Sequence, residues 1–301
     1  MVVPAPRLQP GLPALCGRTR LTAIFGNPVG HSLSPAIHNA AYAALGMERA
    51  YVAFEVKPEH LRDAMRAVTA LGILGVNLTV PHKVRALRML SGASGEARLL
   101  GAANCVTNRR GRLLGDNTDA RGLQMAVESL GVVLRGTTVL TIGAGGGAAA
   151  AVLAALRLGA GRVVIANRTV AKARALGLRL SAVAGPGQQV EWGGLDKLAD
   201  PALLGDVAAV VNATSVGLKD HRFLRCDYGA TQPQTVFYDL IYGAEPTPFM
   251  RPAIVLKRRC FDGREMLLYQ AALAFRIFNG IEPPVDAMRL ALNEALGASG
   301  R

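Results

Sequence analysis

The segment of residues 138–169 constrains the fold most, because it has the order strand, glycine turn, helix and strand. Residues 138–142 are β-branched and aliphatic, which is typical of a short strand that is buried on both faces. Residues 143–148 then fit the pattern G-x-G-x-x-G/A, with Ala148 in the third small position. A strand before this turn and a helix after it predict a Rossmann-type, doubly wound parallel sheet that binds a dinucleotide.

The small residues of this turn have separate roles in dinucleotide binding. The first glycine makes the tight turn, and the second lets the backbone approach a pyrophosphate. The third small residue lets helix and strand pack closely, while the helix N-terminus offers unpaired N–H groups to the phosphates. The predicted cofactor-binding residues of the turn are Gly143, Ala144, Gly145, Gly146 and Gly147. A plain structural turn is the alternative interpretation.

The residues after the second strand indicate which dinucleotide is bound. An NAD site has an Asp or Glu about 20 residues after the turn, which binds the ribose hydroxyls. This chain has no acid between Glu128 and Glu191. Two cations and two short polar side chains stand there instead, and they suit a 2′-phosphate. They are Asn167, Arg168, Thr169 and Lys172. We therefore expect NADP as the cofactor, the alternative being a solvated basic turn.

Length and charge limit the other possibilities. A chain of 301 residues predicts two domains, and its net charge of +13 could attract nucleic acid or steer small anions into a cleft. The basic residues are spread along the chain and only 5% of residues are aromatic, so no nucleic-acid recognition motif is indicated. Four scattered cysteines without a C-x-x-C pair argue against a zinc site, and no metal is expected.

The N-terminal segment and the hydropathy predict a location. Residues 1–20 are rich in Pro and Arg and lack a continuous apolar core, so we expect a disordered tail and not a signal peptide. No apolar run reaches the ~18 residues that a membrane span requires. Together with the pattern of reduced thiols, this predicts a cytoplasmic protein without a membrane partner.

The region before the glycine turn predicts a second α/β domain. Strands alternate with helices there, which is typical of a parallel sheet. Ser34 is the expected N-cap of the first helix, with Pro35 at its first helical position. Residues 103–107 and 112–116 are expected to pair as a hairpin.

Several polar residues of this region end strands or begin helices, where parallel sheets bind ligands. They are Ser32, Ser34, Asn77, Thr79, Lys83, Asn104 and Asp119. Hydride transfer from an alcohol needs a group that takes the hydroxyl proton, and Lys83 is the candidate, with Asp119 as its partner. The simpler interpretation is a solvated lysine and two helix caps. The residue patterns alone thus indicate an NADP-dependent oxidoreductase that acts on a small polar substrate.

Eight motifs extend this interpretation, and in this order they resemble the shikimate dehydrogenase family. They are GNPVGHSLSP, GVNLTVPHK, GAANCVTN, GDNTD, GAGG, NRT, NATSVG and FDGREMLLYQ, which span the chain from about residue 22 to the last helix. The resemblance implies the reversible, NADPH-dependent reduction of 3-dehydroshikimate to shikimate in the chorismate pathway of aromatic amino acid biosynthesis. It also implies a substrate domain of residues 21–119 and 261–301, with an NADP domain of residues 120–260 inserted.

The same resemblance implies roles for single residues. Lys83 and Asp119 match the catalytic pair, and Ser32 and Ser34 match the serines that bind the substrate carboxylate. The other implied substrate-binding residues are Asn77, Thr79, Asn104, Tyr242 and Gln270. Asn167, Arg168, Thr169 and Lys172 match the clamp for the 2′-phosphate, and Thr214 and Gly263 are further expected cofactor contacts.

Two alternative functions remain open at the level of sequence. A quinate/shikimate dehydrogenase of broader specificity often uses NAD, against which Arg168 and the missing acid argue. A non-catalytic, NADP-binding regulator on the same scaffold would have no need of both Lys83 and Asp119. The expected partners are a small-molecule substrate and, at most, a second copy of the chain, because monomer and homodimer are both compatible with the sequence.

Overall fold

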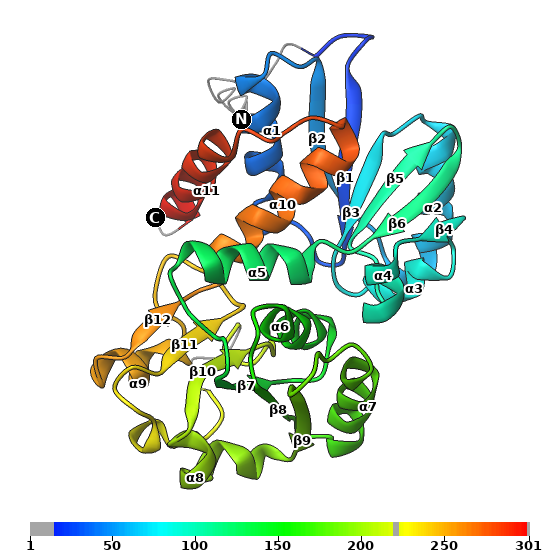
Figure 1. Cartoon of the computed structure of the whole chain (residues 1–301). Helices are drawn as coiled ribbons and strands as arrows, with labels where there is room; N and C mark the ends of the chain where they lie inside the picture. The colour runs from blue at the N-terminus through cyan, green and yellow to red at the C-terminus, as the bar shows by residue number, and fades with distance from the viewer. Residues whose placement is uncertain (1–14, 219–222, 300–301) are drawn as a thin grey trace. The chain divides into compact units, whose positions relative to one another are not determined.

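The computed structural model describes residues 15–218 and 223–299, and it divides the chain into two compact units. Of the described residues, unit 1 comprises 15–94, 102–116 and 271–298, and unit 2 comprises 95–101, 117–218, 223–270 and 299. Each unit is built on its own six-stranded sheet (Figure 1). The predicted α/β fold class with two sheets is therefore confirmed, while the predicted domain limits stay a prediction.

The sheet of unit 1 has the strand order β2-β1-β3-β5-β6-β4. Strand β1 pairs in parallel with β2 and β3, whereas β5 pairs antiparallel with both β3 and β6. The sheet is thus mixed and not purely parallel as expected, because the predicted hairpin enters it directly beside β3. The strands are β1 (Arg20–Gly26), β2 (Arg49–Glu55), β3 (Gly75–Leu78), β4 (Gly92–Ala93), β5 (Cys105–Arg109) and β6 (Arg112–Asp116).

Alternate side chains of these strands pack against helices on opposite faces of the sheet. Ala23 and Phe25 of β1 share a core with the apolar stripe of α2, which includes Leu61 and Met65. On the other face, Tyr42 and Phe275 place α1 and the end of α10 against each other, with ring centroids 5.3 Å apart. The helices of unit 1 are α1 (Ser34–Ala44), a 3₁₀ turn (Pro58–His60), α2 (Leu61–Ala70), α3 (Lys83–Leu87), the end of α10 (Arg264–Asn279) and α11 (Val285–Ser299).

The sheet of unit 2 is parallel throughout and has the order β12-β11-β10-β7-β8-β9. In chain order this is the 3-2-1-4-5-6 arrangement of dinucleotide-binding folds, and the strand order reverses between β7 and β10. The strands are β7 (Thr138–Ile142), β8 (Arg162–Ala166), β9 (Gln189–Gly193), β10 (Val207–Asn212), β11 (Val236–Asp239) and β12 (Arg259–Phe261). The Rossmann-type sheet predicted from residues 138–169 is therefore confirmed.

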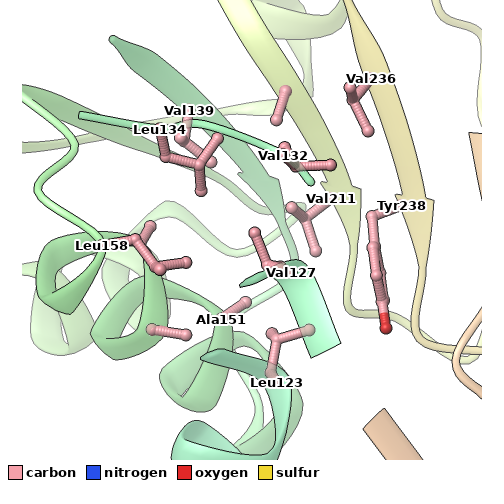
Figure 2. Close-up of a pocket in the computed structure, with 13 residues that line it drawn as sticks. Leu123, Val127, Val132, Leu134, Val139, Ala151, Leu158, Val211, Val236 and Tyr238 are labelled. Carbon is pink, nitrogen blue, oxygen red and sulfur yellow. The ribbon is translucent and has the colours of Figure 1, made fainter. Parts of the chain in front are cut away.

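Two apolar layers cover the faces of this sheet. Helix α6 lies in one of them, and all nine residues from Ala148 to Leu156 are buried. Between α5, α6 and the sheet there is a small apolar cavity of about 20 Å³, into which the side chains labelled in Figure 2 point. The helices of unit 2 are α4 (Gly95–Leu100), α5 (Asp119–Ser129), α6 (Gly146–Arg157), α7 (Val170–Ser181), α8 (Pro201–Leu204), α9 (Met250–Val255), the start of α10, and two 3₁₀ turns (Leu195–Ala199 and Tyr228–Ala230).

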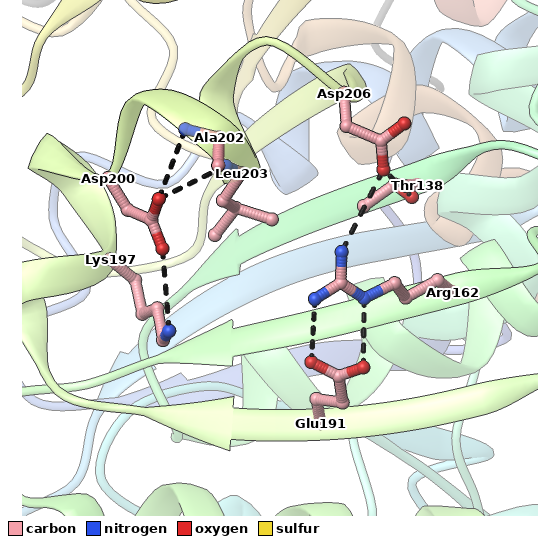
Figure 3. Close-up of polar contacts among 8 residues, drawn as sticks. All are labelled: Thr138, Arg162, Glu191, Lys197, Asp200, Ala202, Leu203 and Asp206. Carbon is pink, nitrogen blue, oxygen red and sulfur yellow. Dashed lines mark hydrogen bonds and ion pairs between the residues drawn. The ribbon is translucent and has the colours of Figure 1, made fainter.

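An ionic network joins strands β7, β8 and β9 at the ends where they begin (Figure 3). Arg162 donates to both carboxylate oxygens of Glu191 on the neighbouring strand, at 2.9 and 2.8 Å. The hydroxyl of Thr138 donates to Asp206 at 2.7 Å, and the same carboxylate oxygen lies 3.8 Å from Arg162. Glu191, the first acid after Glu128, is therefore engaged at the beginning of β8 and not at its end.

Two local predictions differ from the structure. Leu33, and not Ser34, is the N-cap of α1, and no side-chain hydrogen bond caps this helix. The sequence predicts a helix from Ala149 to Leu158, whereas α6 begins at Gly146, so the last glycines of the turn already belong to the helix.

Most of the tail predicted at residues 1–20 lies outside the described residues, and β1 begins at Arg20. Within residues 15–218 and 223–299, no helix is both long and apolar enough to span a bilayer. Over those same ranges, no group of three His, Cys, Asp or Glu side chains is arranged to hold a metal ion.

Candidate active site

The end of β3 carries Asn77, a nearly buried amide whose orientation is fixed from two sides. The phenol of Tyr51 donates to Asn77 Oδ1 at 2.8 Å, and Asn77 Nδ2 donates to the carbonyl oxygen of Asn104 at 3.1 Å. That carbonyl also accepts from the Leu78 amide at 2.8 Å, which ties Asn104 to the end of the strand. Two of the predicted substrate-binding residues, Asn77 and Asn104, are therefore in direct contact.

Ser32 lies between β1 and α1, Ser34 is the first residue of α1, and the two residues contact each other. The amide of Ser34 donates to Ser32 Oγ at 3.3 Å, and the Ser34 residue is buried whereas Ser32 is half-buried. Burial raises the pKa of the Tyr51 phenol well above its usual range, and a hydrogen bond with the Ser34 side chain acts against this rise. Tyr51 thus contacts the predicted ring-binding Asn77 directly.

Lys83 and Thr79 lie on the segment that follows β3. Lys83 is half-buried and is the first residue of α3, and its carbonyl oxygen accepts from the Ala103 amide at 2.9 Å. This bond places the backbone of Lys83 beside Asn104. The amide of Thr79 donates to the Phe25 carbonyl at 3.0 Å, which holds it against the end of β1. The structure therefore gathers the predicted residues of unit 1 at one edge of its sheet.

In unit 2, Asp119 is the buried first residue of α5, and its amide donates to Asn117 Oδ1 at 3.0 Å. Gly122, one helical turn later, contacts Gln270 of α10 so closely that a Cβ at this position would lie 2.7 Å from the Gln270 backbone nitrogen. Gln270 Nε2 donates to the Leu267 carbonyl of its own helix at 2.8 Å. The segments that carry Asp119 and Gln270 are therefore packed directly against each other.

The glycine turn lies where the strand order of unit 2 reverses. Gly143 has a φ of +115°, and a Cβ there would lie 3.0 Å from the Ala213 carbonyl oxygen and 3.2 Å from Thr214 Cγ2. A Cβ at Gly145 or at Gly146 would meet no atom within 4 Å, so open space lies above the turn at the start of α6. The turn thus has the backbone conformation and the free approach that a dinucleotide pyrophosphate requires.

The predicted phosphate clamp follows β8. Asn167 is half-buried and its Nδ2 donates to the Thr169 carbonyl at 2.9 Å, while Arg168, Thr169 and Lys172 are exposed. Helix α7 begins at Val170, so the first-turn N–H groups and two cations lie on one short segment. This donor set fits a phosphate better than a pair of ribose hydroxyls, because every charged group on it is positive.

The remaining predicted residues of unit 2 follow β10, β11 and β12. The Thr214 hydroxyl donates to Asn212 Oδ1 at 2.8 Å. The amide of Gly263 donates to the Ile241 carbonyl at 3.1 Å, and a Cβ at Gly263 would overlap the Leu240 carbonyl oxygen, so a larger residue does not fit. Burial raises the pKa of the Tyr242 phenol. The roles of all these residues stay predictions.

Sequence reasoning missed Asp239, the fully buried last residue of β11. Asp239 accepts hydrogen bonds from Asn212 Nδ2 at 2.9 Å, from the Thr247 hydroxyl at 2.6 Å and from the Ile241 amide at 3.0 Å. Burial raises its pKa to about 6, although these three donors act in the opposite direction. The sequence feature that marks Asp239 is its place as a polar residue at the end of an apolar strand.

Sequence reasoning also missed Tyr51, because aromatic residues are typical of strands in any case. No local pattern marks this tyrosine as a neighbour of Asn77, which lies in a different strand.

The sheet of unit 2 is parallel, its glycine turn lies where the strand order reverses, and a basic clamp follows its second strand in sequence. Together these features define the class of the protein, a nucleotide-dependent oxidoreductase with two α/β units. Comparisons with known proteins narrow the class. Residues 24–106 match the model of the shikimate dehydrogenase substrate binding domain, and residues 263–292 match that of the shikimate 5'-dehydrogenase C-terminal domain. The shikimate dehydrogenase (NADP(+)) of Geobacter sp. (strain M21) is 41% identical over 291 residues, covering 95% of this chain and 99% of that protein. The chain belongs to the shikimate dehydrogenase family.

Solved structures agree with this assignment. A crystal structure of a shikimate dehydrogenase in complex with NADP⁺ matches with a TM-score of 0.86 at 33% identity, covering 94% of this chain and 98% of the other. The shikimate 5-dehydrogenase of Thermus thermophilus, solved in complex with NADP(H) and shikimate, matches with a TM-score of 0.81 at 35% identity, covering 92% and 100%.

Proposed function

We propose that this protein catalyses the reversible, NADPH-dependent reduction of 3-dehydroshikimate to shikimate. The observation that supports this most strongly is the 41% identity to an NADP(+)-dependent shikimate dehydrogenase over 95% of the chain. The glycine turn with Gly143 at positive φ and the acid-free end of β8 agree with it, because they suit NADP.

In this proposal Lys83 and Asp119 carry the proton chemistry. When bound, NADPH supplies the hydride that is added to the ring carbon at position 3. Lys83 gives a proton to the oxygen on this carbon, and it takes the proton back when shikimate is oxidised. Asp119 orients the Lys83 ammonium and accepts a hydrogen bond from a ring hydroxyl.

Hydroxyl and amide groups hold the rest of the substrate. Ser32 and Ser34 donate to the substrate carboxylate. Because the two residues contact each other, both can bind the same carboxylate. Asn77 donates to a ring hydroxyl with the amide hydrogen that it does not use toward Asn104. The remaining proposed contacts to the ring are made by Thr79, Asn104, Tyr242 and Gln270.

The cofactor contacts are divided between the turn and the clamp. The backbone of residues 143–147 would hold the pyrophosphate, and Thr214 and Gly263 are the further proposed cofactor contacts. Arg168 and Lys172 neutralise the 2′-phosphate, and Asn167 and Thr169 complete the set of donors. We place the enzyme in the cytoplasm, which agrees with its four free cysteines, and we expect a monomer or a homodimer.

Initial rates with purified protein test the proposal. Shikimate with NADP⁺ is compared with shikimate and NAD⁺, and with quinate and either cofactor. Turnover mainly with shikimate and NADP⁺ is expected. Equal turnover with quinate or with NAD⁺ would indicate the broader subfamily, and a folded protein that binds NADPH without any turnover would contradict the enzymatic assignment.

A further inference from the structure

Tyr51 contacts a predicted substrate-binding residue of unit 1, because its phenol donates to Asn77 Oδ1 at 2.8 Å. Tyr51 is 1% exposed and therefore does not reach solvent or substrate itself. We propose that Tyr51 is a positioning residue, which fixes the Asn77 amide so that it offers the substrate ring a hydrogen-bond donor and no acceptor. This inference rests on the proposed function.

The position of Tyr51 is fixed by its own neighbours. Asn39 pairs with its backbone in the manner of an additional strand, since its Oδ1 accepts from the Tyr51 amide at 2.8 Å and its Nδ2 donates to the Tyr51 carbonyl at 2.9 Å. The ring of His38 stacks on the Tyr51 ring at 4.2 Å between centroids, with 7° between the planes. The phenol oxygen therefore has little freedom to move away from Asn77.

His38 behaves as an apolar ring in this stack. It is fully buried, burial lowers its pKa to about 3, and neither ring nitrogen has a hydrogen-bond partner among the described residues. An unpaired buried polar group costs free energy of folding. The neutral imidazole thus contributes to the site through its flat contact with Tyr51, and it does not exchange protons near neutral pH.

The two contacts of Asn77 determine what it can offer a ligand. Its oxygen is occupied by the Tyr51 phenol, and one amide hydrogen is occupied by the Asn104 carbonyl. If the amide rotated by half a turn, its oxygen would face the Asn104 carbonyl oxygen, which is unfavourable. The second amide hydrogen is therefore presented in one direction and selects ligands with an oxygen acceptor at that place.

A matched pair of variants tests this role. Tyr51→Phe removes only the phenol oxygen, and Tyr42→Phe does the same to a tyrosine of unit 1 that is fully buried and 2.7 Å from the Thr22 hydroxyl. Both variants should lower Tm. Tyr51→Phe should also raise KM for shikimate about tenfold with KM for NADP⁺ unchanged, because the Asn77 amide loses its fixed orientation. Tyr42→Phe should leave both KM values unchanged.

A double-mutant cycle shows whether Tyr51 acts through Asn77. In an Asn77→Ala background, Tyr51→Phe should cause no further rise in KM for shikimate. If wild type turns over shikimate while Tyr51→Phe keeps its KM, or if the two changes multiply independently, the positioning role is wrong and the proposed function stands. If wild type does not turn over shikimate with NADP⁺, the proposed function and this inference both fail.

A second measurement covers the case in which Tyr51→Phe does not fold. In wild-type protein with ¹⁵N-labelled asparagine side chains, addition of shikimate should shift one of the two Nδ2 proton resonances of Asn77. The other proton, bonded to the Asn104 carbonyl, should keep its resonance. Equal shifts of both protons, or of neither, would overturn the inference.

Discussion

Asp239 predicts an unusual pH dependence of stability. The carboxyl is fully buried, and burial raises its pKa from 3.8 to about 6. The folded state therefore keeps a proton that the unfolded chain has already lost between these values. The stabilisation is complete below 3.8 and disappears as the pH rises through about 6. One pKa unit corresponds to about 1.4 kcal/mol, so the total effect is about 3 kcal/mol.

The comparison of Asp239→Asn with wild type isolates this contribution from all other carboxylates. We expect wild type to lose about 2 kcal/mol relative to Asp239→Asn between about pH 4.5 and about pH 7.5, as measured by urea unfolding at several pH values. Glu245→Gln, an exposed carboxylate of unit 2, is the matched control and should show no such difference. If the stability difference between wild type and Asp239→Asn is independent of pH, or grows in the opposite direction, the reasoning about Asp239 is refuted.

Three further predictions concern the catalytic pair, the clamp and the packing of α5. Lys83→Ala should lower kcat by at least about 100-fold with little change in NADP⁺ affinity, and near-normal turnover in a steady-state assay would remove Lys83 from the mechanism. Arg168→Ala should weaken NADPH binding far more than NADH binding in a fluorescence titration, because only NADPH carries the 2′-phosphate; an equal loss for both would contradict the clamp. Gly122→Ala should destabilise the protein by about 1–3 kcal/mol in urea unfolding, because the added Cβ would lie 2.7 Å from the Gln270 backbone nitrogen. An unchanged unfolding midpoint would show that α5 and α10 can separate without a cost in stability.

The sequence predicted those parts of the fold that depend on local pattern. The glycine turn, the strands on either side of it and the hairpin of β5 and β6 follow from apolar periodicity and turn residues. The strands β9 and β12 and the two-residue β4 escaped prediction, because they are short edge strands without a continuous apolar run. Their pairing is determined by neighbouring strands and not by their own residues.

The candidate site, like the fold, was predictable only where a local sequence pattern marks the residue. Positions such as Lys83 and Asp119 were predicted because they begin helices in motifs that resemble a known family. Ser34 was predicted as a helix cap, but no side-chain hydrogen bond caps α1. Asn77 is held by Tyr51 of another strand, a contact between residues 26 positions apart. Long-range contacts of this kind, like those of Asp239 with Asn212 and Thr247, have no signature in the local sequence.

Two asparagines at strand ends show why residue type alone does not identify a binding group. Asn212, which ends β10, has its nitrogen bonded to Asp239 and its oxygen bonded to both the amide and the hydroxyl of Thr214. Its amide thus holds Thr214 in the loop whose backbone lies against Gly143, and this is a structural task. Asn77 has its oxygen occupied by Tyr51 but uses only one of its two amide hydrogens toward Asn104. The amide hydrogen that Asn77 does not use toward Asn104 is the one that we propose for the substrate ring, since a bound ring hydroxyl would give this buried donor a partner.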